Sequence, residues 1–321
     1  MEKQPSSDAP EERALYFFNY FCYHSATLPT HQTPKAKHCM RSFIFCLLIV
    51  VTSSVCAQPS SDLPASSTSW FERDVALFLR LTGKGFAAPL SWEGEDWKNA
   101  AALVFGTAVS STLDDEAYNA TLRNQTPTND DLERLFEAYS NGLSGILLSG
   151  MLYGVGVAFE SEWLHGTGLV MASALTISAI TQTTLKYITG RARPYTGLGN
   201  HTFRPFSFNA DFVAFPSGHT IVAFTISTVL AERIGNPFAS FVLYTAATLG
   251  GISRIYSGNH WLSDVVFGAG MAFSVSRSVL KWYGEESTAA GQGERVRTAP
   301  LRMAGVEIHP TMNRIVLVWR F

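Results

Sequence analysis

The sequence is organised around the stretch Ser253-Arg-Ile-Tyr-Ser-Gly-Asn-His260-Trp-Leu-Ser-Asp264, in which an arginine, a histidine and a carboxylate stand at fixed intervals. An apolar run follows its polar part, so a helix is predicted to begin near His260. Positions i and i+4 share one face of a helix. The Asp264 carboxylate is therefore predicted to accept the Nδ1 proton of His260, leaving Nε2 as a nucleophile or base. Arg254 is predicted in the preceding loop as an anion-binding group. An ordinary helix start with a satisfied His–Asp pair is the alternative for this stretch alone.

Two further polar stretches stand at the ends of apolar runs. Phe215-Pro-Ser217-Gly218-His219-Thr220 precedes the apolar run Ile221–Leu230. A small-residue turn at a helix N-terminus presents backbone N–H groups, a hydroxyl and a histidine, which together can hold an anion. Upstream, Lys186-Tyr-Ile-Thr-Gly-Arg-Ala-Arg193-Pro194 ends another apolar run, and Pro194 marks where that helix stops. Together, the three stretches predict a pocket for a tetrahedral oxyanion.

The order and spacing of these stretches resemble a known signature. Lys186-x6-Arg193-Pro194, Pro216-Ser217-Gly218-His219 and Ser253-Arg254-x5-His260-x3-Asp264 match, at every position, the three-part signature of the type 2 phosphatidic acid phosphatase (PAP2) superfamily. That superfamily also contains bacterial class A acid phosphatases and vanadium haloperoxidases. The resemblance covers approximately residues 95–285 and implies a helical phosphatase domain.

The same residues supply what phosphoryl transfer needs, namely a nucleophile, charge for the equatorial oxygens and a proton for the leaving group. His260 is predicted as the nucleophile that forms a phosphohistidine, with Asp264 orienting it. His219 is predicted as the general acid, which protonates the leaving group and later activates water. The residues predicted to bind the substrate phosphate are Lys186, Arg193, Ser217, Gly218 and Arg254. Three of these are cations, so no metal and no other cofactor are predicted. The resemblance implies the same roles.

Other functions remain open from the sequence. A vanadate-dependent haloperoxidase could use the same pocket with vanadate in place of phosphate, and a catalytically silent membrane protein is a third reading. His165 and His201 stand alone in the sequence and are predicted as loop or surface residues rather than ligands. Trp261 and Tyr256 flank the histidine motif and belong either to the wall of the pocket or to the core.

The composition excludes one class of partner. The 321 residues carry 24 Lys+Arg and 26 Asp+Glu, so no basic surface for nucleic acid is expected. The hydrophobic fraction of 46% is high for a soluble protein, whereas the slightly positive mean hydropathy is low for a chain embedded mostly in lipid. The predicted partners are a membrane and a phosphorylated lipid or small phosphomonoester.

The N-terminal region has the pattern of an export signal preceded by an extension. Residues 1–39 show no periodicity and are predicted to be unstructured. Residues 40–57 run from Met40 through an apolar run to Val55-Cys56-Ala57, which predicts a signal peptide, with a short membrane anchor as the alternative. All four cysteines precede the cleavage point, so the mature chain is predicted to form no disulfide. A Ser/Pro-rich linker follows at residues 58–69. The protein is expected in the bacterial periplasm, associated with the membrane or integral to it.

An all-α fold with a six-helix bundle core is predicted within residues 70–285. The six helices are expected at residues 97–113, 143–159, 169–188, 220–234, 238–256 and 261–283. An up-and-down bundle of these helices brings the motif residues to one end. Residues 70–81 form an amphipathic pattern and are expected to pack on the bundle, with a bilayer surface as the alternative. The acidic connection from Asp114 to Glu133 is expected to be solvated, and residues 130–139 within the same region are expected to form a capped surface helix.

The apolar runs fit two arrangements in the membrane. The first, second and fourth runs are shorter than the roughly 20 residues that a span needs, so the bundle either spans the bilayer in part or docks on it from the periplasm. Residues 286–321 are predicted as a flexible segment followed by a small β-hairpin around His309–Asn313. Lipid phosphates, isoprenoid diphosphates and soluble phosphomonoesters present the same head group, so the sequence leaves the substrate open.

Overall fold

The computed structural model of the chain describes residues 70–207, 209–289, 301–303, 306–311 and 314–319. The chain divides into two units, Met1–Pro59 and Ser60–Phe321, and every described residue belongs to the second. The predicted extension, signal peptide and linker (residues 1–39, 40–57 and 58–69) lie outside the described residues.

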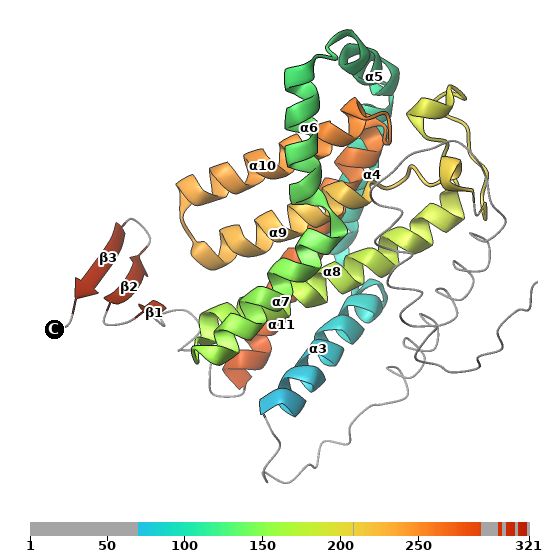
Figure 1. Cartoon of the computed structure of the whole chain (residues 1–321). Coiled ribbons are helices and arrows are strands. Elements are labelled where there is room, and N and C mark those ends of the chain that lie inside the picture. Colours follow the sequence, from blue (N-terminus) through green and yellow to red (C-terminus); the bar gives the residue numbers. More distant parts are fainter. Residues whose placement is uncertain (1–69, 208, 290–300, 304–305, 312–313, 320–321) are drawn as a thin grey trace, which may run out of the picture. The chain divides into compact units, whose positions relative to one another are not determined.

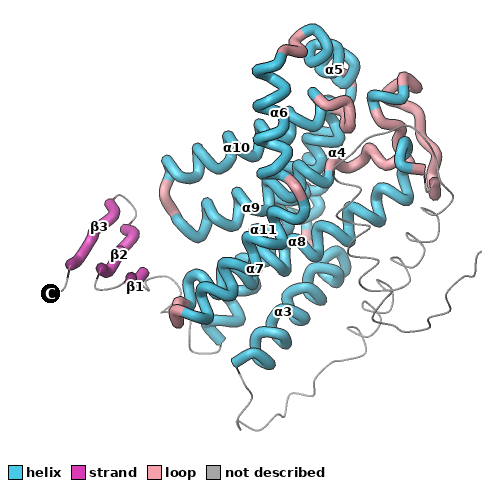
Figure 2. Tube along the Cα trace, viewed as in Figure 1, coloured by secondary structure: helices cyan, strands magenta, loops and turns pink. Residues whose placement is uncertain are grey.

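The described part of the second unit is mostly helical, in agreement with the predicted fold class (Figures 1 and 2). Its α-helices are α3 (Trp70–Ala87), α4 (Gly94–Ser111), α5 (Asp114–Arg123), α6 (Pro127–Ser140), α7 (Gly142–Ala158), α8 (Glu162–Thr189), α9 (Gly218–Ile234), α10 (Pro237–Tyr256) and α11 (Leu262–Ala289). Three short 3-10 helices are η1 (Ala88–Ser91), η2 (Pro194–Thr196) and η3 (Ala210–Phe212).

Local caps fix the starts of α7 and α8, and one left-handed glycine ends α8 beside the first motif. The side chains of Asn141 and Ser161 accept hydrogen bonds from backbone N–H groups at the starts of α7 and α8, which satisfies donors that a helix start leaves unpaired. Gly190 ends α8 with a φ of 55°, and a Cβ atom there would lie 1.8 Å from the Arg204 carbonyl oxygen. Only glycine tolerates both constraints. The chain therefore turns sharply after Lys186 into the loop that carries the second cation of the first motif.

The core lies where α8 packs against α7, α9 and α11. Its buried apolar side chains are Leu81, Leu169, Val170, Met171, Ala174, Ile177, Ile226, Val229, Val279 and Tyr283. Burial of each large aliphatic side chain contributes about 1.5–3 kcal/mol, so this cluster holds fixed the helices whose ends carry the motifs. Leu81 belongs to α3, which shows that the amphipathic helix packs on the bundle as predicted.

Each of the six predicted helical stretches falls on a helix, in the order α4, α7, α8, α9, α10 and α11. Two helical segments lie where no helix was expected. α5 begins the acidic connection, and α11 continues to Ala289, past the predicted end of the domain at residue 285. In the added turn of α11, the Glu286 carboxylate accepts a hydrogen bond from Lys84 of α3 at 2.7 Å. This contact joins the last turns of α11 to α3.

Three strands follow in the tail. They are β1 (Leu301–Met303), β2 (Val306–Thr311) and β3 (Arg314–Trp319), which pair antiparallel in the order β1-β2-β3. Val306 lies opposite Trp319, and Thr311 lies opposite Arg314.

Two of the described helices, α8 and α10, are long and apolar enough to cross a membrane, and the bent pair α6–α7 would make a third span. The faces of α4, α7 and α10 also expose large apolar side chains: Trp97, Val104, Phe105, Val109, Leu143, Ile146, Leu147, Met151, Val155, Phe238, Phe241, Val242, Leu249 and Ile252. Apolar surfaces of this extent are unusual on a monomeric protein in water. These features indicate association with a membrane.

Candidate active site

The predicted site residues come together where four helices begin or end. Their positions are the last turn of α8 (Lys186) and the loop after it (Arg193), the start of α9 (Ser217, Gly218, His219), the last turn of α10 (Arg254), and the start of α11 with the residues just before it (His260, Asp264). Arg254 is helical, so its predicted place in a loop was wrong. Backbone hydrogen bonds join these ends: Ser217 N donates to Asp264 O at 3.1 Å, and His260 N donates to Arg254 O at 3.1 Å.

The orienting partner of His260 differs from the predicted one. Its Nδ1 lies 2.5 Å from the carbonyl oxygen of Ala214, whereas the nearest carboxylate oxygen of Asp264 is 3.8 Å away. The predicted His260–Asp264 hydrogen bond was therefore wrong. A carbonyl oxygen can only accept, so Nδ1 carries the proton and Nε2 keeps its lone pair. The tautomer is the one that was predicted, but the Ala214 carbonyl oxygen fixes it and Asp264 does not.

Asp264 is instead held by two other donors. Its Oδ2 accepts a hydrogen bond from Trp261 N at 2.8 Å, and its Oδ1 accepts one from Arg191 Nη1 at 2.5 Å. The first bond closes the start of α11, since a carboxylate there satisfies an N–H group that the helix leaves unpaired. Asp264 therefore fixes the backbone beside His260 rather than its imidazole ring.

Arg191 and Asp114 form a buried network with Asp264 that the sequence analysis missed. Arg191 Nη2 donates to Asp114 Oδ2 at 2.7 Å, and Ser263 donates to Asp114 from both its backbone N and its hydroxyl, at 2.8 and 2.7 Å. Asp114 is 0% exposed, so the prediction of a solvated acidic connection was wrong at this residue. The one hint in the sequence was Arg191, the first arginine in Gly190-Arg-Ala-Arg193, which the signature does not require.

The turn before α9 is closely packed. Ser217 is fully buried, and its hydroxyl accepts a hydrogen bond from Thr220 Oγ1 at 2.9 Å. A Cβ atom on Gly218 would lie 2.6 Å from the side-chain oxygen of Gln182, one turn before Lys186 on α8. Glycine therefore lets α8 approach the N-terminus of α9, which places the lysine next to the helix start.

The cations of the first motif retain donors for an anion. Among the described residues, Lys186 Nζ donates one hydrogen bond, to Val213 O at 2.5 Å, and an ammonium has three donors. Arg193 Nη1 donates to Asn259 Oδ1 at 2.7 Å, while its Nε is buried and has no hydrogen-bond partner among the described residues. A buried N–H group without a partner is costly, so an anion that accepts from it would be stabilised.

Arg254 is held from the side of α6. It is 2% exposed, and its Nη2 and Nη1 donate to Glu133 at 2.5 Å and to Glu137 at 3.2 Å. Its Nε donates to Ser253 Oγ at 3.1 Å. These bonds use three of the five N–H groups of a guanidinium and leave one on each terminal nitrogen. After Asp114, Glu133 is thus the second acid of the predicted acidic connection that pairs with a buried arginine instead of facing water.

Positive charge surrounds both histidines. Burial, with the nearby charges of Arg254, His260, Lys186 and Arg193, lowers the pKa of His219 to about 3. Burial and the charges of Lys186 and Arg193 also lower the pKa of His260 well below its usual value. Both imidazoles are therefore neutral when no anion is bound. A bound dianion opposes these charges and raises both pKa values again.

Comparison with known families gives a match for this part of the chain. Residues 167–287 match the PAP2 superfamily, and the match includes all three motifs and the start of α11.

The curated relatives of this chain share one name. Lipid A 1-phosphatase of Rhizobium etli is 33% identical over 126 residues, which are 38% of this chain and 51% of the relative. Lipid A 1-phosphatase of Porphyromonas gingivalis is 37% identical over 92 residues, which are 28% of this chain and 18% of the relative. The chain thus spans about half, or less, of the length of these relatives.

Two solved structures resemble the PAP2 domain. Aquifex aeolicus LpxE has 25% identity and a TM-score of 0.42, with 53% of this chain and 95% of that chain covered. A PAP2-type phosphatidylglycerolphosphate phosphatase from Bacillus subtilis has 18% identity and a TM-score of 0.46, with 58% and 96% covered.

The remaining predicted residues lie around the PAP2 motifs or far from them. Trp261 is buried, and its Nε1 donates to Ala192 O at 2.8 Å, so it belongs to the core. His165 is partly buried in α8, where its Nε2 lies 2.7 Å from Asp74 Oδ2. His201 is exposed in a turn, as predicted.

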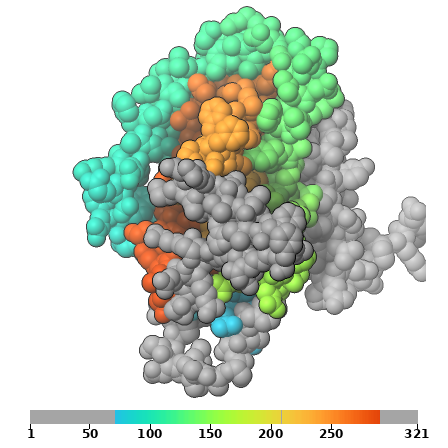
Figure 3. Space-filling view, turned by 90° about the vertical axis from the view of Figure 1, so that its left-hand side faces the viewer, coloured from blue at the N-terminus to red at the C-terminus, as the bar shows by residue number. Residues whose placement is uncertain are grey.

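α5 and α6 lie beside α10 at the end of the helices that carries the motif residues, as the teal-to-green and orange atoms show in Figure 3.

Proposed function

We propose that this chain is a metal-independent phosphatase that hydrolyses a lipid phosphate or another phosphomonoester through a phosphohistidine intermediate. The observation that carries the proposal is the hydrogen bond from His260 Nδ1 to the Ala214 carbonyl oxygen, because it leaves Nε2 unprotonated among cations. The phosphatase names of the curated relatives support the same reaction class. These relatives do not favour the haloperoxidase alternative.

The reaction proceeds in two displacements. His260 Nε2 attacks phosphorus while the P–O bond to the leaving group breaks, and His219, protonated once the dianion is bound, gives its proton to the departing oxygen. Neutral His219 then accepts a proton from water, which attacks the phosphohistidine and releases phosphate. Five groups bind the phosphoryl oxygens throughout: Lys186, Arg193, Arg254, Ser217 Oγ and the Gly218 N–H. Three cations supply the charge that a divalent metal ion supplies in other phosphatases.

The relatives and the apolar surface support a phosphorylated lipid as the substrate class. Lipid A 1-phosphatases act on a phosphorylated lipid, and the long apolar helices of this chain fit a substrate that resides in a membrane. The proposed enzyme comprises residues 70–289, to the end of α11, with α4 and α7–α11 as its six-helix core, and the three strands β1–β3 follow in the tail. The pattern of residues 40–57 supports export, which would place the enzyme on the periplasmic side of a membrane.

Purified full-length protein in detergent tests the proposal. Hydrolysis of phosphatidic acid and of p-nitrophenyl phosphate should persist in EDTA and be inhibited competitively by vanadate, which resembles the transition state. Brief reaction with radiolabelled phosphatidic acid should yield a label that is stable to alkali and labile to acid, as a phosphohistidine is. His260→Ala should abolish turnover and labelling while its melting temperature stays near that of the wild type. Loss of activity in EDTA that magnesium or zinc restores would contradict the mechanism.

A further inference from the structure

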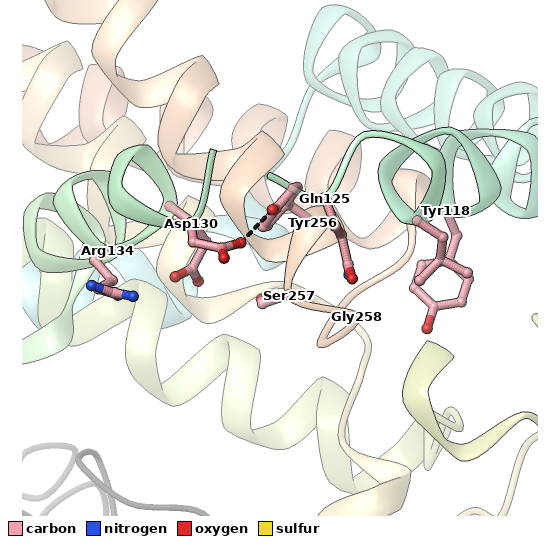
Figure 4. A pocket seen from close by; sticks show the side chains of 9 residues that line it. Tyr118, Gln125, Asp130, Arg134, Tyr256, Ser257 and Gly258 are labelled. Carbon is pink, nitrogen blue, oxygen red and sulfur yellow. Dashed lines mark hydrogen bonds between the residues drawn. The ribbon is translucent and has the colours of Figure 1, made fainter. Parts of the chain in front are cut away.

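A polar pocket and an exposed aromatic segment lie beside the motif residues, outside the catalytic groups. The pocket has a volume of about 330 Å³ and lies between α5, α6 and the turn after α10 (Figure 4). The dashed bond in Figure 4 joins Asp130 of its lining to the Tyr256 hydroxyl. The lining arginine, Arg134, is paired with Asp131. The segment comprises residues 203–206 in the loop after α8, and its one charge has no such partner.

The segment reads Phe203-Arg204-Pro205-Phe206, and all four residues are exposed. The Phe203 side chain is 48% exposed, and that of Phe206 is 59% exposed. Arg204 forms no ion pair with any described residue, and its guanidinium carbon lies 4.4 Å from the centre of the buried Phe212 ring. An unpaired cation between two exposed rings fits a surface that is both anionic and apolar.

Backbone hydrogen bonds fix this segment to the end of α8. Arg204 N donates to Gly190 O at 2.6 Å. Phe206 N donates to Tyr187 O at 2.7 Å, and the two rings pack edge to face with 5.1 Å between their centres. The last turn of α8 also exposes Ile188. Because α8 is a candidate span, an apolar surface that continues from its last turn lies where such a span would leave the membrane.

The backbone of Phe206 is held in an unfavourable conformation. Its φ is 60°, in a region that bulky side chains rarely adopt and that Gly, Asn and Asp tolerate. A ring retained only for packing would be buried, whereas more than half of this one is exposed. Strain at an exposed aromatic residue therefore points to a function of the side chain outside the folded core.

We propose that residues 203–206 form a contact surface for an anionic lipid bilayer, with the rings of Phe203 and Phe206 among the head groups and Arg204 on a lipid phosphate. Aromatic side chains favour the boundary between head groups and acyl chains. Lys186 lies in the last turn of α8, so this contact would hold the cationic site at the level of the lipid phosphates. The proposal goes beyond the phosphatase function, because a lipid contact can be detected without turnover.

Photocrosslinking identifies what touches the segment. In the full-length protein, Phe206 is replaced by p-benzoylphenylalanine, and the protein is reconstituted in vesicles of phosphatidylcholine and phosphatidylglycerol. The same replacement of Leu122, which lines the polar pocket, is the control. Irradiation should add the mass of a lipid at position 206 in a clearly larger fraction of the protein than at position 122. Equal lipid adducts at both positions, or an adduct at position 206 to residues 1–69 or to a second copy of the chain, would overturn the proposal.

The positive φ provides a second test. Phe206→Asn and Phe203→Asn each remove one ring, but only the first places asparagine at a positive φ, which asparagine tolerates. Phe206→Asn should therefore melt in detergent no lower than Phe203→Asn. Both should lower kcat/KM for phosphatidic acid in vesicles about fivefold, the effect of returning roughly 40 Å² of apolar surface to water, and leave p-nitrophenyl phosphate within about twofold.

The outcomes separate the lipid contact from the phosphatase. An equal loss on p-nitrophenyl phosphate would show that the two rings act on the catalytic groups, and a lower melting temperature of Phe206→Asn would show that its ring serves the fold. Either result would overturn the lipid contact. If the wild type hydrolysed neither substrate, the phosphatase function would be wrong, while the lipid adduct at position 206 would still decide whether the segment contacts the bilayer.

Discussion

The behaviour of His260 depends on two neighbours of different kinds. The Ala214 carbonyl oxygen fixes which ring nitrogen carries the proton, and the charges of Lys186 and Arg193 keep the ring from taking a second one. The cations prevent the second protonation only while no anion is bound. When a phosphate dianion enters, its charge offsets that of the cations, and proton transfer through His219 becomes favourable. In the proposed mechanism, the same cations therefore keep His260 neutral and attract the substrate whose charge enables acid catalysis.

Arg193→Gln is expected to shift the pH profile. Removing one positive charge weakens the repulsion that disfavours the imidazolium form. The pKa values of His260 and His219 should therefore rise toward the ordinary histidine range. The acid limb of kcat/KM reports groups of the free enzyme, so it should move to higher pH. The profile is measured with p-nitrophenyl phosphate and corrected for ionisation of the substrate. Lys98→Gln, which removes an exposed cation of α4, is the control. An acid limb that stays in place would contradict the assignment.

His219→Ala distinguishes the acid from the nucleophile. His219 has no carboxylate at i+4, and its proposed role is to protonate the leaving oxygen, which matters most when the leaving group is poor. We expect His219→Ala to lose far more kcat/KM on an alkyl phosphate than on p-nitrophenyl phosphate, and His260→Ala to lose both alike. The opposite pattern in the two variants would mean that the roles are reversed.

At the scale of elements, α5 and α6 act as a brace for the ends of α10 and α11. Asp114, the first residue of α5, binds the start of α11 through Ser263, and Glu133 of α6 binds Arg254 at the end of α10. Helix ends leave unpaired backbone groups and are the parts most prone to fray. Fixing them with charged side chains from a neighbouring element keeps the motif residues in register with each other.

Asp114→Ala should destabilise the fold more than the neighbouring substitution Asp115→Ala. Asp114 is fully buried against Arg191, and removing one partner of a buried ion pair costs about 3–5 kcal/mol of the free energy of unfolding. Asp115 is exposed, so its removal should cost no more than about 0.5 kcal/mol. Unfolding in detergent, followed by circular dichroism, measures both. Equal effects of the two substitutions would show that the network contributes no stability.

The helices that carry the site were predictable because their signals are local. Apolar runs and the residues at their ends lie within one segment of sequence, so Lys186 and His219 could be assigned to helix ends. Their long-range partners carried no such signal. Ala214 lies 46 residues from His260, Glu133 lies 121 from Arg254, and Asp114 lies 149 from Ser263. Nothing in the periodicity of an acidic connection shows which carboxylate will be buried by folding.

At the scale of the whole described unit, the helices differ in what they expose. The exposed large side chains of α7 and α10 are apolar, whereas α6 exposes the paired Asp131 and Arg134 beside two leucines. The cationic site lies at the ends of helices that include both unbroken candidate spans, α8 and α10. This arrangement suits the proposed enzyme, which would hold its substrate's phosphate at the boundary of a membrane while lipid surrounds the apolar helices.

The membrane assignment predicts a difference between two leucine-to-lysine substitutions. Leu249 in α10 is 37% exposed and Leu122 in α5 is 46% exposed, so neither change disrupts a buried core position. A lysine in the middle of a membrane-spanning helix costs about 3 kcal/mol on insertion, whereas a lysine on a helix outside the candidate spans, such as α5, costs little. The wild type and Leu122→Lys should therefore stay in the membrane pellet after an alkaline carbonate wash. Leu249→Lys should be recovered there in a clearly smaller fraction of total protein, measured by immunoblot. Release of the wild type by the wash, or equal recovery of both variants, would show that α10 does not cross the bilayer.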